Sequence, residues 1–389
     1  MRDGVIASVD GLGTVPSPET GARWIRIDLA GAWVMPGLID THVHVARFPD
    51  TRDHAERILR TAVRGGVTGV RDLGGDARTL AELERAAGAG EFRGPTVLYS
   101  AMFGGDDIYA QGPTSQLASG RPPGAAPWAR MIDARTDLRQ AIAEAKGTGA
   151  GNIKLYGDMT PTLVQATIHE ANHQGLKTSA HATVFPARPS DMVEAGIGSL
   201  SHAPYLIWEA VETVPADYGA RTAAPWKTVP PDHPRLLALY RRMAARGVSL
   251  DATLYVYKAM REYSPQVQAA WTDDAFAWAV QATRLAHAAG VKVTTGTDWF
   301  EPRDESDLPH THAELALLVE AAGFTPMEAI IAGTRNGAEA LGMSTALGTV
   351  EVGKQADLLV LDASPLEDIH NTTRVRMTVK QGALVDVLD

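Results

Sequence analysis

The chain of 389 residues contains no cysteine. Disulfide bonds and thiolate metal ligands are therefore excluded, which leaves histidine, aspartate, glutamate or a modified lysine as the available metal ligands. The absence of cysteine does not by itself indicate a cellular compartment.

Long apolar runs and an excess of basic residues are also missing. No segment approaches the ~18 apolar residues needed to cross a membrane, and residues 1–4 lack the apolar core of a secretory signal. The 36 lysines and arginines are outnumbered by 46 aspartates and glutamates, so the net charge is -10. A nucleic-acid surface would need a basic patch. We therefore expect a cytoplasmic protein that binds neither membranes nor nucleic acid.

The sequence does contain a repeated alternation of strand-like and helix-like segments. Short strand-like segments carry a polar or ionisable residue near their C-terminal ends, at residues 152–156, 177–181, 199–202 and 291–298. This alternation is typical of an α/β protein with a parallel sheet. A site at the C-terminal ends of the strands is typical of a TIM barrel, which takes about 250 residues and leaves room here for a small second domain.

The two ends of the chain follow a different pattern, close to the period of two that is typical of strands. Strands are expected at residues 5–9, 24–29, 348–353, 356–361 and 375–379. We expect residues 1–34 and 345–389 to form one small β-sandwich beside a barrel of residues 35–344. Thr325, Pro326 and Glu328 predict the start of a helix with a capping box. The stretch from Gly112 to Pro127, rich in proline and glycine, predicts a long loop over the barrel mouth.

Two histidines end the first strand-like segment of the predicted barrel. Side chains at i and i+2 of a strand point to the same face, so His42 and His44 can converge on one point. A single His-x-His pair is more often structural than metal-binding, so the remaining ligands must come from other strands.

Three motifs together resemble the amidohydrolase superfamily. They read Pro-Gly-Leu-Ile-Asp-Thr-His-Val-His at residues 36–44, Gly-Val-Thr-Gly-Val-Arg-Asp-Leu-Gly-Gly at 66–75, and Gly-Lys-Gln-Ala-Asp-Leu-Leu-Val-Leu-Asp at 353–362. The resemblance covers nearly the whole chain. Within the superfamily, the chain is most similar to the branch of imidazolonepropionase-like enzymes and metal-dependent prolidases and dipeptidases.

The resemblance implies a ligand set for two metal ions. His42, His44 and Asp298 would hold the first ion, His181 and His202 the second, and a carbamylated Lys154 would bridge the two. Parity supports Lys154, because Asn152, Lys154 and Tyr156 share one strand face while Ile153 and Leu155 take the apolar face. Zinc is expected, with two ions per chain, although manganese, cobalt or iron would fit the same nitrogen and oxygen ligands.

The resemblance also implies a reaction. Zinc lowers the pKa of its bound water from 15.7 to about 7, which makes hydroxide available at neutral pH. The expected activity is hydrolysis of an amide bond in a small substrate such as a dipeptide or an N-acyl amino acid. Asp298 would be the catalytic residue, taking a proton from the attacking water and passing it to the leaving nitrogen.

The substrate is less well defined by the sequence. Prolidase-like relatives carry a Gly-Gly-His-Gly motif where this chain reads Gly104-Gly105-Asp106-Asp107, and the acidic pair would favour a basic group. Residues 312–329 match the same branch closely. Tyr156 and Tyr205 are candidate substrate-binding residues. Arg71 and Asp72 are expected to form a structural ion pair beneath the site.

Three interpretations remain open from the sequence. The first is a binuclear amide hydrolase. The second is a mononuclear imidazolonepropionase-like cyclic amidase or deaminase that acts on a ring substrate and leaves Lys154 unmodified. The third is a catalytically silent barrel that serves as a binding protein. The family often forms symmetric assemblies, so a homo-oligomer is possible, and relatives usually have one or two more strands before this N-terminus, which suggests a trimmed chain.

Overall fold

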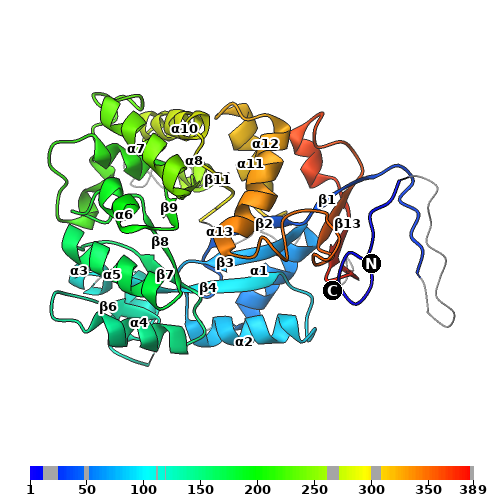
Figure 1. The fold of residues 1–389 in the computed structure, drawn as a ribbon, viewed down its shortest axis with the longest axis horizontal. Coiled ribbons are helices and arrows are strands. Elements are labelled where there is room, and N and C mark those ends of the chain that lie inside the picture. Colours follow the sequence, from blue (N-terminus) through cyan, green and yellow to red (C-terminus); the bar gives the residue numbers. More distant parts are fainter. Residues whose placement is uncertain are drawn as a thin grey trace.

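A computed structural model describes residues 1–11, 25–47, 52–110, 113–118, 120–260, 271–298 and 308–385. Eight parallel strands follow one another in the order of the sequence around a nearly closed barrel, with helices outside them (Figure 1). The strands are β2 (Leu38–Val43), β3 (Val67–Asp72), β4 (Thr96–Gly104), β7 (Asn152–Leu155), β8 (Lys177–His181), β9 (Ser199–Ser201), β10 (Ser249–Asp251) and β11 (Val293–Thr294). The predicted α/β barrel is confirmed.

The barrel closes where its last strand meets its first. The backbone N–H of Thr41 donates to the carbonyl of Thr295 at 2.8 Å, and the N–H of Asp298 donates to the carbonyl of His42 at 2.8 Å. These bonds join the chain after β11 to β2, and we call this junction the seam. A short hairpin of β5 (Ala125–Ala126) and β6 (Ala129–Met131) adds to β4.

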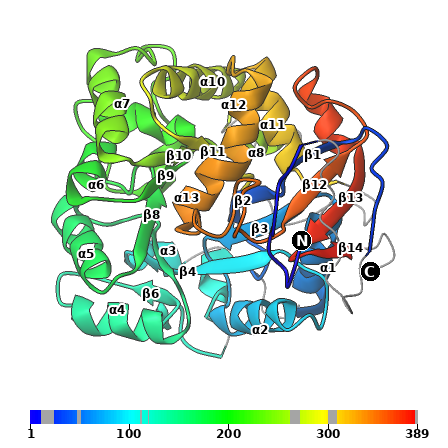
Figure 2. The same cartoon turned by 45° about the vertical axis from the view of Figure 1, so that its right-hand side comes forward.

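Helices ring the barrel (Figure 2). Several begin with a side-chain cap, as at Asp76, Asp137 and Thr160, which satisfies backbone N–H groups that have no partner in the helix. The helices are α1 (Arg52–Arg64), α2 (Ala77–Gly88), α3 (Asp106–Ala110), α4 (Leu138–Gly147), α5 (Pro161–His173), α6 (Pro189–Ala195), α7 (Pro234–Arg246), α8 (Leu254–Met260), α10 (Asp273–Ala288), α11 (Thr311–Glu320), α12 (Pro326–Ile331) and α13 (Gly337–Leu341).

Shorter helical turns complete the chain. They are the 3-10 turns η1 (Pro113–Gln116), η2 (Ala203–Glu209), η3 (Tyr218–Thr222) and η5 (Ile369–Thr373), and the π-helical η4 (Ala332–Asn336). The capping box predicted at the start of α12 is confirmed, since Thr325 and Glu328 each accept from the other's backbone N–H. No described helix combines the length and apolar character that a bilayer crossing requires.

Strand parity sorts the side chains of β7 as the sequence predicted. Ile153 and Leu155 are fully buried on the apolar face, while the amide of Asn152 donates to Ser100 and Ser179 and the amine of Lys154 donates to Ser201. The interior of the barrel is therefore polar at this level, and its outer wall packs against helices.

A four-stranded antiparallel sheet joins the two ends of the chain beside the barrel. Its strands are β1 (Trp33–Pro36), β12 (Leu358–Leu361), β13 (Val375–Lys380) and β14 (Ala383–Val385), in that order. Asp357 forms a buried ion pair with Lys380 at 2.6 Å and anchors the end of the sheet. The small β unit built from both ends is confirmed. The strand expected at 356–361 appears as β12, which begins only at Leu358, and the strand expected at 375–379 appears as β13.

Other strands expected at the chain ends are wrong. Residues 348–353 consist of a bend, irregular backbone and a turn, and residues 25–29 are not a strand. Near the N-terminus, Val5 makes only isolated bridges to Arg2 and Gln355. Alternation of apolar and polar residues also suits an extended segment that lies on a surface without a pairing partner. Within the described residues, the two ends of the chain form one antiparallel sheet rather than a two-sheet sandwich. Trp24, the first residue of the strand expected at 24–29, is not among the described residues.

Candidate active site

Two histidines and one aspartate converge at the C-terminal end of the barrel. His42 lies in β2, and His44 follows that strand on the same face. The Nε2 atoms of His42 and His44 lie 3.2 Å and 3.1 Å from Oδ1 of Asp298, and the three ligand atoms lie within 4.8 Å of one another. This group, His42, His44 and Asp298, is called the primary cluster below.

The ring orientations in the primary cluster suit a cation. Nδ1 of His42 faces the carboxylate of Asp251 at 3.2 Å, and Nδ1 of His44 faces the carbonyl of Gly74 at 3.1 Å. When each Nδ1–H donates to these acceptors, the lone pair of each Nε2 points at the carboxylate of Asp298. Second partners of this kind commonly fix the tautomer of a metal-binding histidine.

The seam sets the position of Asp298. A Cβ atom at Gly296 would lie 2.8 Å from the Cβ of His42, so only glycine lets the two strands approach this closely. Asp298 itself has a φ of 52°, and His202 and Thr253 have φ values of 73° and 52°. Left-handed backbone in residues other than glycine is uncommon and gathers at functional sites.

His181 and His202 form a second group beside the primary cluster. His181 ends β8, His202 follows β9, their ring centroids lie 4.7 Å apart, and the ring of His202 lies 5.0 Å from that of His42. Nδ1 of His202 shares a hydrogen bond with the hydroxyl of Thr253 at 2.9 Å. Burial lowers the pKa of His202 to about 3 and that of His181 well below its usual range, so both rings are neutral.

One ring nitrogen in this group has no protein partner. Nδ1 of His181 is buried and forms no hydrogen bond within the described residues. An unsatisfied buried polar atom costs about 1–3 kcal/mol. A neutral imidazole with a free buried nitrogen is the form that binds a metal ion, so the residues present fit such a ligand.

Lys154 lies fully buried next to these histidines. Its Nζ donates to Oγ of Ser201 at 2.8 Å, and no described carboxylate lies within ion-pair distance of it. Burial lowers the pKa of Lys154 to about 7, against the opposing effect of Asp251. The predicted ligand residues, His42, His44, Lys154, His181, His202 and Asp298, are thus gathered at one end of the barrel.

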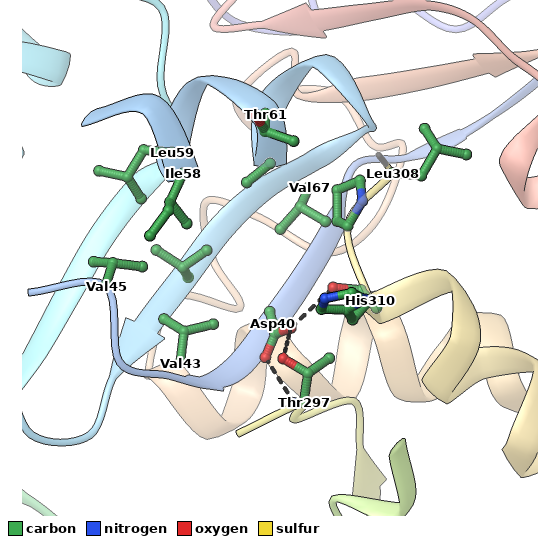
Figure 3. Close-up of a pocket in the computed structure, with 14 residues that line it drawn as sticks. Asp40, Val43, Val45, Ile58, Leu59, Thr61, Val67, Thr297, Leu308 and His310 are labelled. Carbon is green, nitrogen blue, oxygen red and sulfur yellow. Dashed lines mark hydrogen bonds between the residues drawn. The ribbon is translucent and has the colours of Figure 1, made fainter. Parts of the chain in front are cut away.

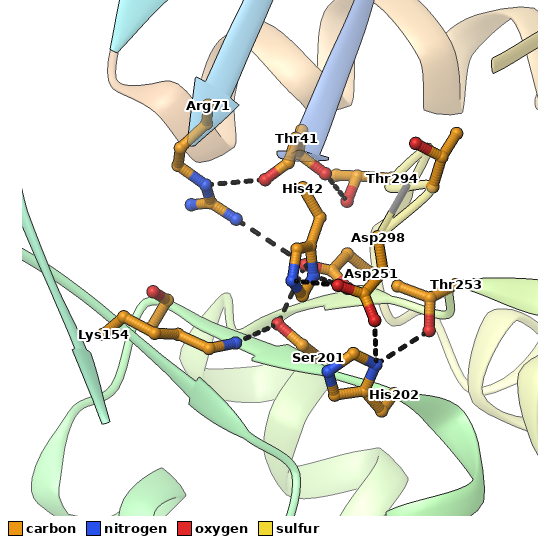
Figure 4. Close-up of polar contacts among 12 residues, drawn as sticks. Thr41, His42, Arg71, Lys154, Ser201, His202, Asp251, Thr253, Thr294 and Asp298 are labelled. Atoms are coloured by element: carbon orange, nitrogen blue, oxygen red, sulfur yellow. Dashed lines mark hydrogen bonds and ion pairs between the residues drawn. The ribbon is translucent and has the colours of Figure 1, made fainter. Parts of the chain in front are cut away.

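Asp251 is a member of this site that the sequence reasoning missed (Figure 4). It ends β10, is fully buried, accepts from Ser201 at 2.9 Å and lies 3.8 Å from the guanidinium of Arg71. It therefore connects His42, Ser201 and, through Ser201, Lys154. The pattern that identified the other site residues, an ionisable residue at the end of a strand, is also present at Asp251. The strand was not recognised because it has only three residues.

Replacing Asp251 with asparagine tests this connection. We expect Asp251→Asn to lower metal affinity or kcat/KM by about 10- to 100-fold, because His42 loses the charge that holds its ring. Competition with a chelator and steady-state kinetics measure the two effects. The matched control is Asp274→Asn, which removes a half-exposed carboxylate on α10 and should change neither. Unchanged metal affinity and kcat/KM in Asp251→Asn would contradict the role.

The ion pair expected between Arg71 and Asp72 is wrong. Neighbouring residues of a strand point to opposite faces, and the Arg71 side chain donates to the carbonyl of Thr41 at 2.8 Å and approaches Asp251 instead. Asp72 accepts the backbone N–H groups of Val45 and Gly74 at 2.7 Å and 2.9 Å. Both residues support the site from beneath, through separate contacts.

A cavity of about 300 Å³ opens onto the histidines. The predicted substrate-binding residues Tyr156 and Tyr205 both line it. The other lining residues are His44, Arg47, Gly74, Met102, Thr114, Leu117, His181, His202, Tyr218, Arg221, Val256, Tyr257, Met260, Trp271 and Asp298. Thr114 and Leu117 come from the segment predicted to cover the barrel mouth, which includes η1 and β5 rather than being all loop.

The acidic pair after β4 is not part of this cavity. Asp106 and Asp107 are exposed on α3, and neither lines the cavity. These two carboxylates therefore give no reason to expect a preference for a basic substrate group. The local turn into α3 carries these side chains outward.

A smaller, apolar cavity of about 50 Å³ lies behind β2 (Figure 3). Asp40 at its edge accepts from the hydroxyls of Thr297 and Thr311, both at 2.9 Å. Burial raises the pKa of Asp40 to about 6. These bonds attach the chain on either side of residues 299–307 to β2, which helps to place the neighbouring Asp298.

The family model for the amidohydrolase family matches residues 33–385. The chain belongs to the amidohydrolase family. It is therefore a hydrolase that acts on carbon–nitrogen bonds. Members typically bind divalent metals, and the primary cluster is a possible site for one.

Individual relatives agree with this assignment. An ochratoxinase from Aspergillus niger is 27% identical over 385 residues, covering 86% of this chain and 71% of the relative. An imidazolonepropionase from Maricaulis maris is 26% identical over 400 residues, covering 95% and 88%. A putative prolidase structure from Bifidobacterium longum matches with a TM-score of 0.73 and 26% identity over 98% of this amidohydrolase and 87% of the prolidase. A Xaa-Pro dipeptidase structure with a TM-score of 0.76 and 21% identity, covering 99% and 93%, shares the fold.

Proposed function

We propose that this amidohydrolase cleaves the amide bond of a small substrate, such as a dipeptide or an N-acyl amino acid, at a centre of two divalent metal ions, preferably zinc. The observation that carries the proposal is the convergence of the primary cluster, His181, His202 and Lys154 beside one cavity. His42, His44 and Asp298 would hold one ion, and His181 and His202 the other.

Lys154 supports the binuclear form of the proposal. A buried ammonium without a carboxylate partner is costly, whereas a carbamate on the same nitrogen is an anion with two oxygen ligands. The amine lies next to Ser201, whose hydroxyl is already engaged with Asp251. We infer that Lys154 is carbamylated in the active protein and bridges the two ions.

Divalent metals at this centre would supply a nucleophilic water at neutral pH and polarise the substrate carbonyl. The protein itself supplies the proton transfers. Asp298 has its carboxylate partly exposed to the cavity while the rings of His42 and His44 hold it. It can accept the proton of the attacking water and deliver it to the leaving nitrogen as general base and then general acid. Tyr156 and Tyr205 line the space in which the substrate would lie.

A mononuclear enzyme acting on a ring substrate is the second candidate. The primary cluster alone is compact enough to hold one ion, and imidazolonepropionases are among the relatives. In that case Lys154 would remain an unmodified amine. The number of bound ions separates the two candidates.

Elemental analysis of protein purified in bicarbonate-containing buffer without added metal tests the proposal. We expect about two zinc ions per chain, and we expect the same protein to hydrolyse members of a panel of dipeptides and N-acyl amino acids. About one ion per chain, with turnover only of lactams or azoles, would favour the mononuclear candidate. No bound metal even after reconstitution would contradict both.

A further inference from the structure

A buried carboxyl group outside the cavity holds the backbone that leads into it. Glu314 lies on α11 and is fully buried. Its Oε1 accepts from the backbone N–H of Leu254 at 3.0 Å, and its Oε2 accepts from the backbone N–H of Tyr255 at 2.6 Å. Both oxygens are therefore engaged by the first two residues of α8, so one side chain joins two helices.

The carboxyl group of Glu314 is costly to ionise in this place. Burial raises its pKa to about 8, the charges of Asp40 and Asp251 act in the same direction, and the two N–H groups oppose the rise. Within the described residues, no lysine, arginine or histidine forms an ion pair with it. The backbone at the start of α8 is therefore the interaction that stabilises the carboxylate.

The residue just before α8 connects this contact to a predicted metal ligand. Thr253 is fully buried and has a φ of 52°, a conformation that residues other than glycine rarely adopt. Its hydroxyl shares a hydrogen bond with Nδ1 of His202 at 2.9 Å (Figure 4). A shift of the backbone at Leu254 would therefore move the group that orients the ring of His202.

The helix α8 also brings part of the cavity wall to the same histidine. Val256, Tyr257 and Met260 line the cavity. The ring of Tyr257 meets the ring of His202 edge-on, with centroids 5.9 Å apart. Thr253 and Tyr257 thus both contact His202, and both belong to the segment whose start Glu314 holds.

We propose that Glu314 is a positioning residue that acts through residues 253–255 to hold His202 in the orientation that binds the second metal ion. Glu314 itself does not line the cavity. Replacing a group that orients a metal ligand typically costs about 10- to 100-fold in metal affinity. This inference rests on the proposed function for the role of His202 as a ligand, whereas the orientation of its ring can be tested without metal.

Glu314→Gln tests the proposal because it keeps the size of the side chain and one acceptor. Its NH2 group would face a backbone N–H, so one of the two bonds at the start of α8 is lost. We expect the affinity for one of the two zinc ions to fall about 10- to 100-fold in competition with a chelator, while the other ion binds as in wild type. In the metal-free protein, the NMR signals of the His202 ring nitrogens, assigned with His202→Gln, should shift.

Two further variants locate the route of this effect. Glu320→Gln changes an exposed carboxylate on the same helix, which pairs with His370, and it should alter neither the zinc affinity nor the His202 signals. Thr253→Val removes the hydroxyl that meets His202 and should reproduce the loss of zinc affinity. The double variant of Glu314→Gln and Thr253→Val should lose about as much as the larger single variant, because both changes break one route.

The outcomes separate a positioning role from a purely structural one, which would lower thermal stability alone. Unchanged zinc affinity and unchanged His202 signals in Glu314→Gln would overturn the inference, as would full additivity in the double variant. If Glu314→Gln does not fold, the same measurements apply to Glu314→Asp, whose oxygens lie one methylene further from α8.

The same data distinguish this inference from the proposed function. Two bound ions and amide hydrolysis, with zinc affinity and His202 signals that do not depend on Glu314, would overturn the positioning role and leave the proposed function standing. A wild type that binds a single ion and hydrolyses no amide, with His202 signals that still shift in Glu314→Gln, would support the positioning role and contradict the proposed function.

Discussion

Asp298→Asn is expected to retain bound metal and lose about 10²- to 10⁴-fold of kcat, the range that a positioned general base or acid contributes. Asparagine keeps the side-chain shape and an oxygen that can face His42 and His44. It also tolerates the left-handed backbone, with a φ of 52°, that Asp298 adopts. The change therefore removes the proton acceptor without straining the seam.

The measurement for Asp298→Asn combines elemental analysis, thermal unfolding and single-turnover kinetics. Asp274→Asn on α10 again serves as the control, since its carboxylate pairs only with the exposed Lys227 among described residues. A kcat within a few-fold of wild type would exclude Asp298 as the general base. Loss of metal together with kcat would instead show that its charge is needed for the ion itself.

Lys154→Ala should lower the metal content from about two ions per chain to about one and reduce kcat by at least about 100-fold. The reason is that the carbamate would be the one anion shared by both ions, and fixed ligand geometry matters strongly in such centres. Removing the buried side chain also leaves a space next to Ser201. Short carboxylic acids such as acetate or propionate should enter that space, supply two oxygens and restore part of the activity.

Rescue distinguishes a carbamate from a plain lysine. Acetate would not replace an unmodified ammonium, because the two carry opposite charges. Lys227→Ala removes an exposed lysine and should neither lose activity nor respond to acetate. Full activity and unchanged metal content in Lys154→Ala would rule out the bridge.

The sequence allowed the barrel and the gathering of six site residues to be predicted because strand ends of a parallel barrel share one rim. His42 and His44 come from one strand by parity, and Lys154, His181, His202 and Asp298 come from four others. Their metal-binding roles remain predictions. Asp251 was not predicted because β10 is short and contains only one apolar residue, Leu250.

Site residues on long connections between strands and helices could not be predicted from strand ends and parity. Tyr218 and Arg221 lie between η2 and α7, far along a connection with no periodic pattern, and their place over the cavity depends on a contact with Asp158 from another loop. Asp106 and Asp107 were wrongly expected to face the substrate for a related reason. Proximity to the end of a strand does not fix the direction of a side chain that follows a turn. Tertiary contacts decide such positions.

The seam described above brings together the two halves of the primary cluster, His42 and His44 at the end of the first barrel strand and Asp298 in the segment that follows the last. An ion held by both would act as a reversible cross-link in a chain that has no disulfide. A ligand that binds only the folded state stabilises it by mass action, and linking distant segments restricts the unfolded chain. The same ion would then stabilise the folded barrel as well as take part in catalysis. The metal supply of the cell would therefore govern the lifetime of the folded protein as well as its catalytic rate.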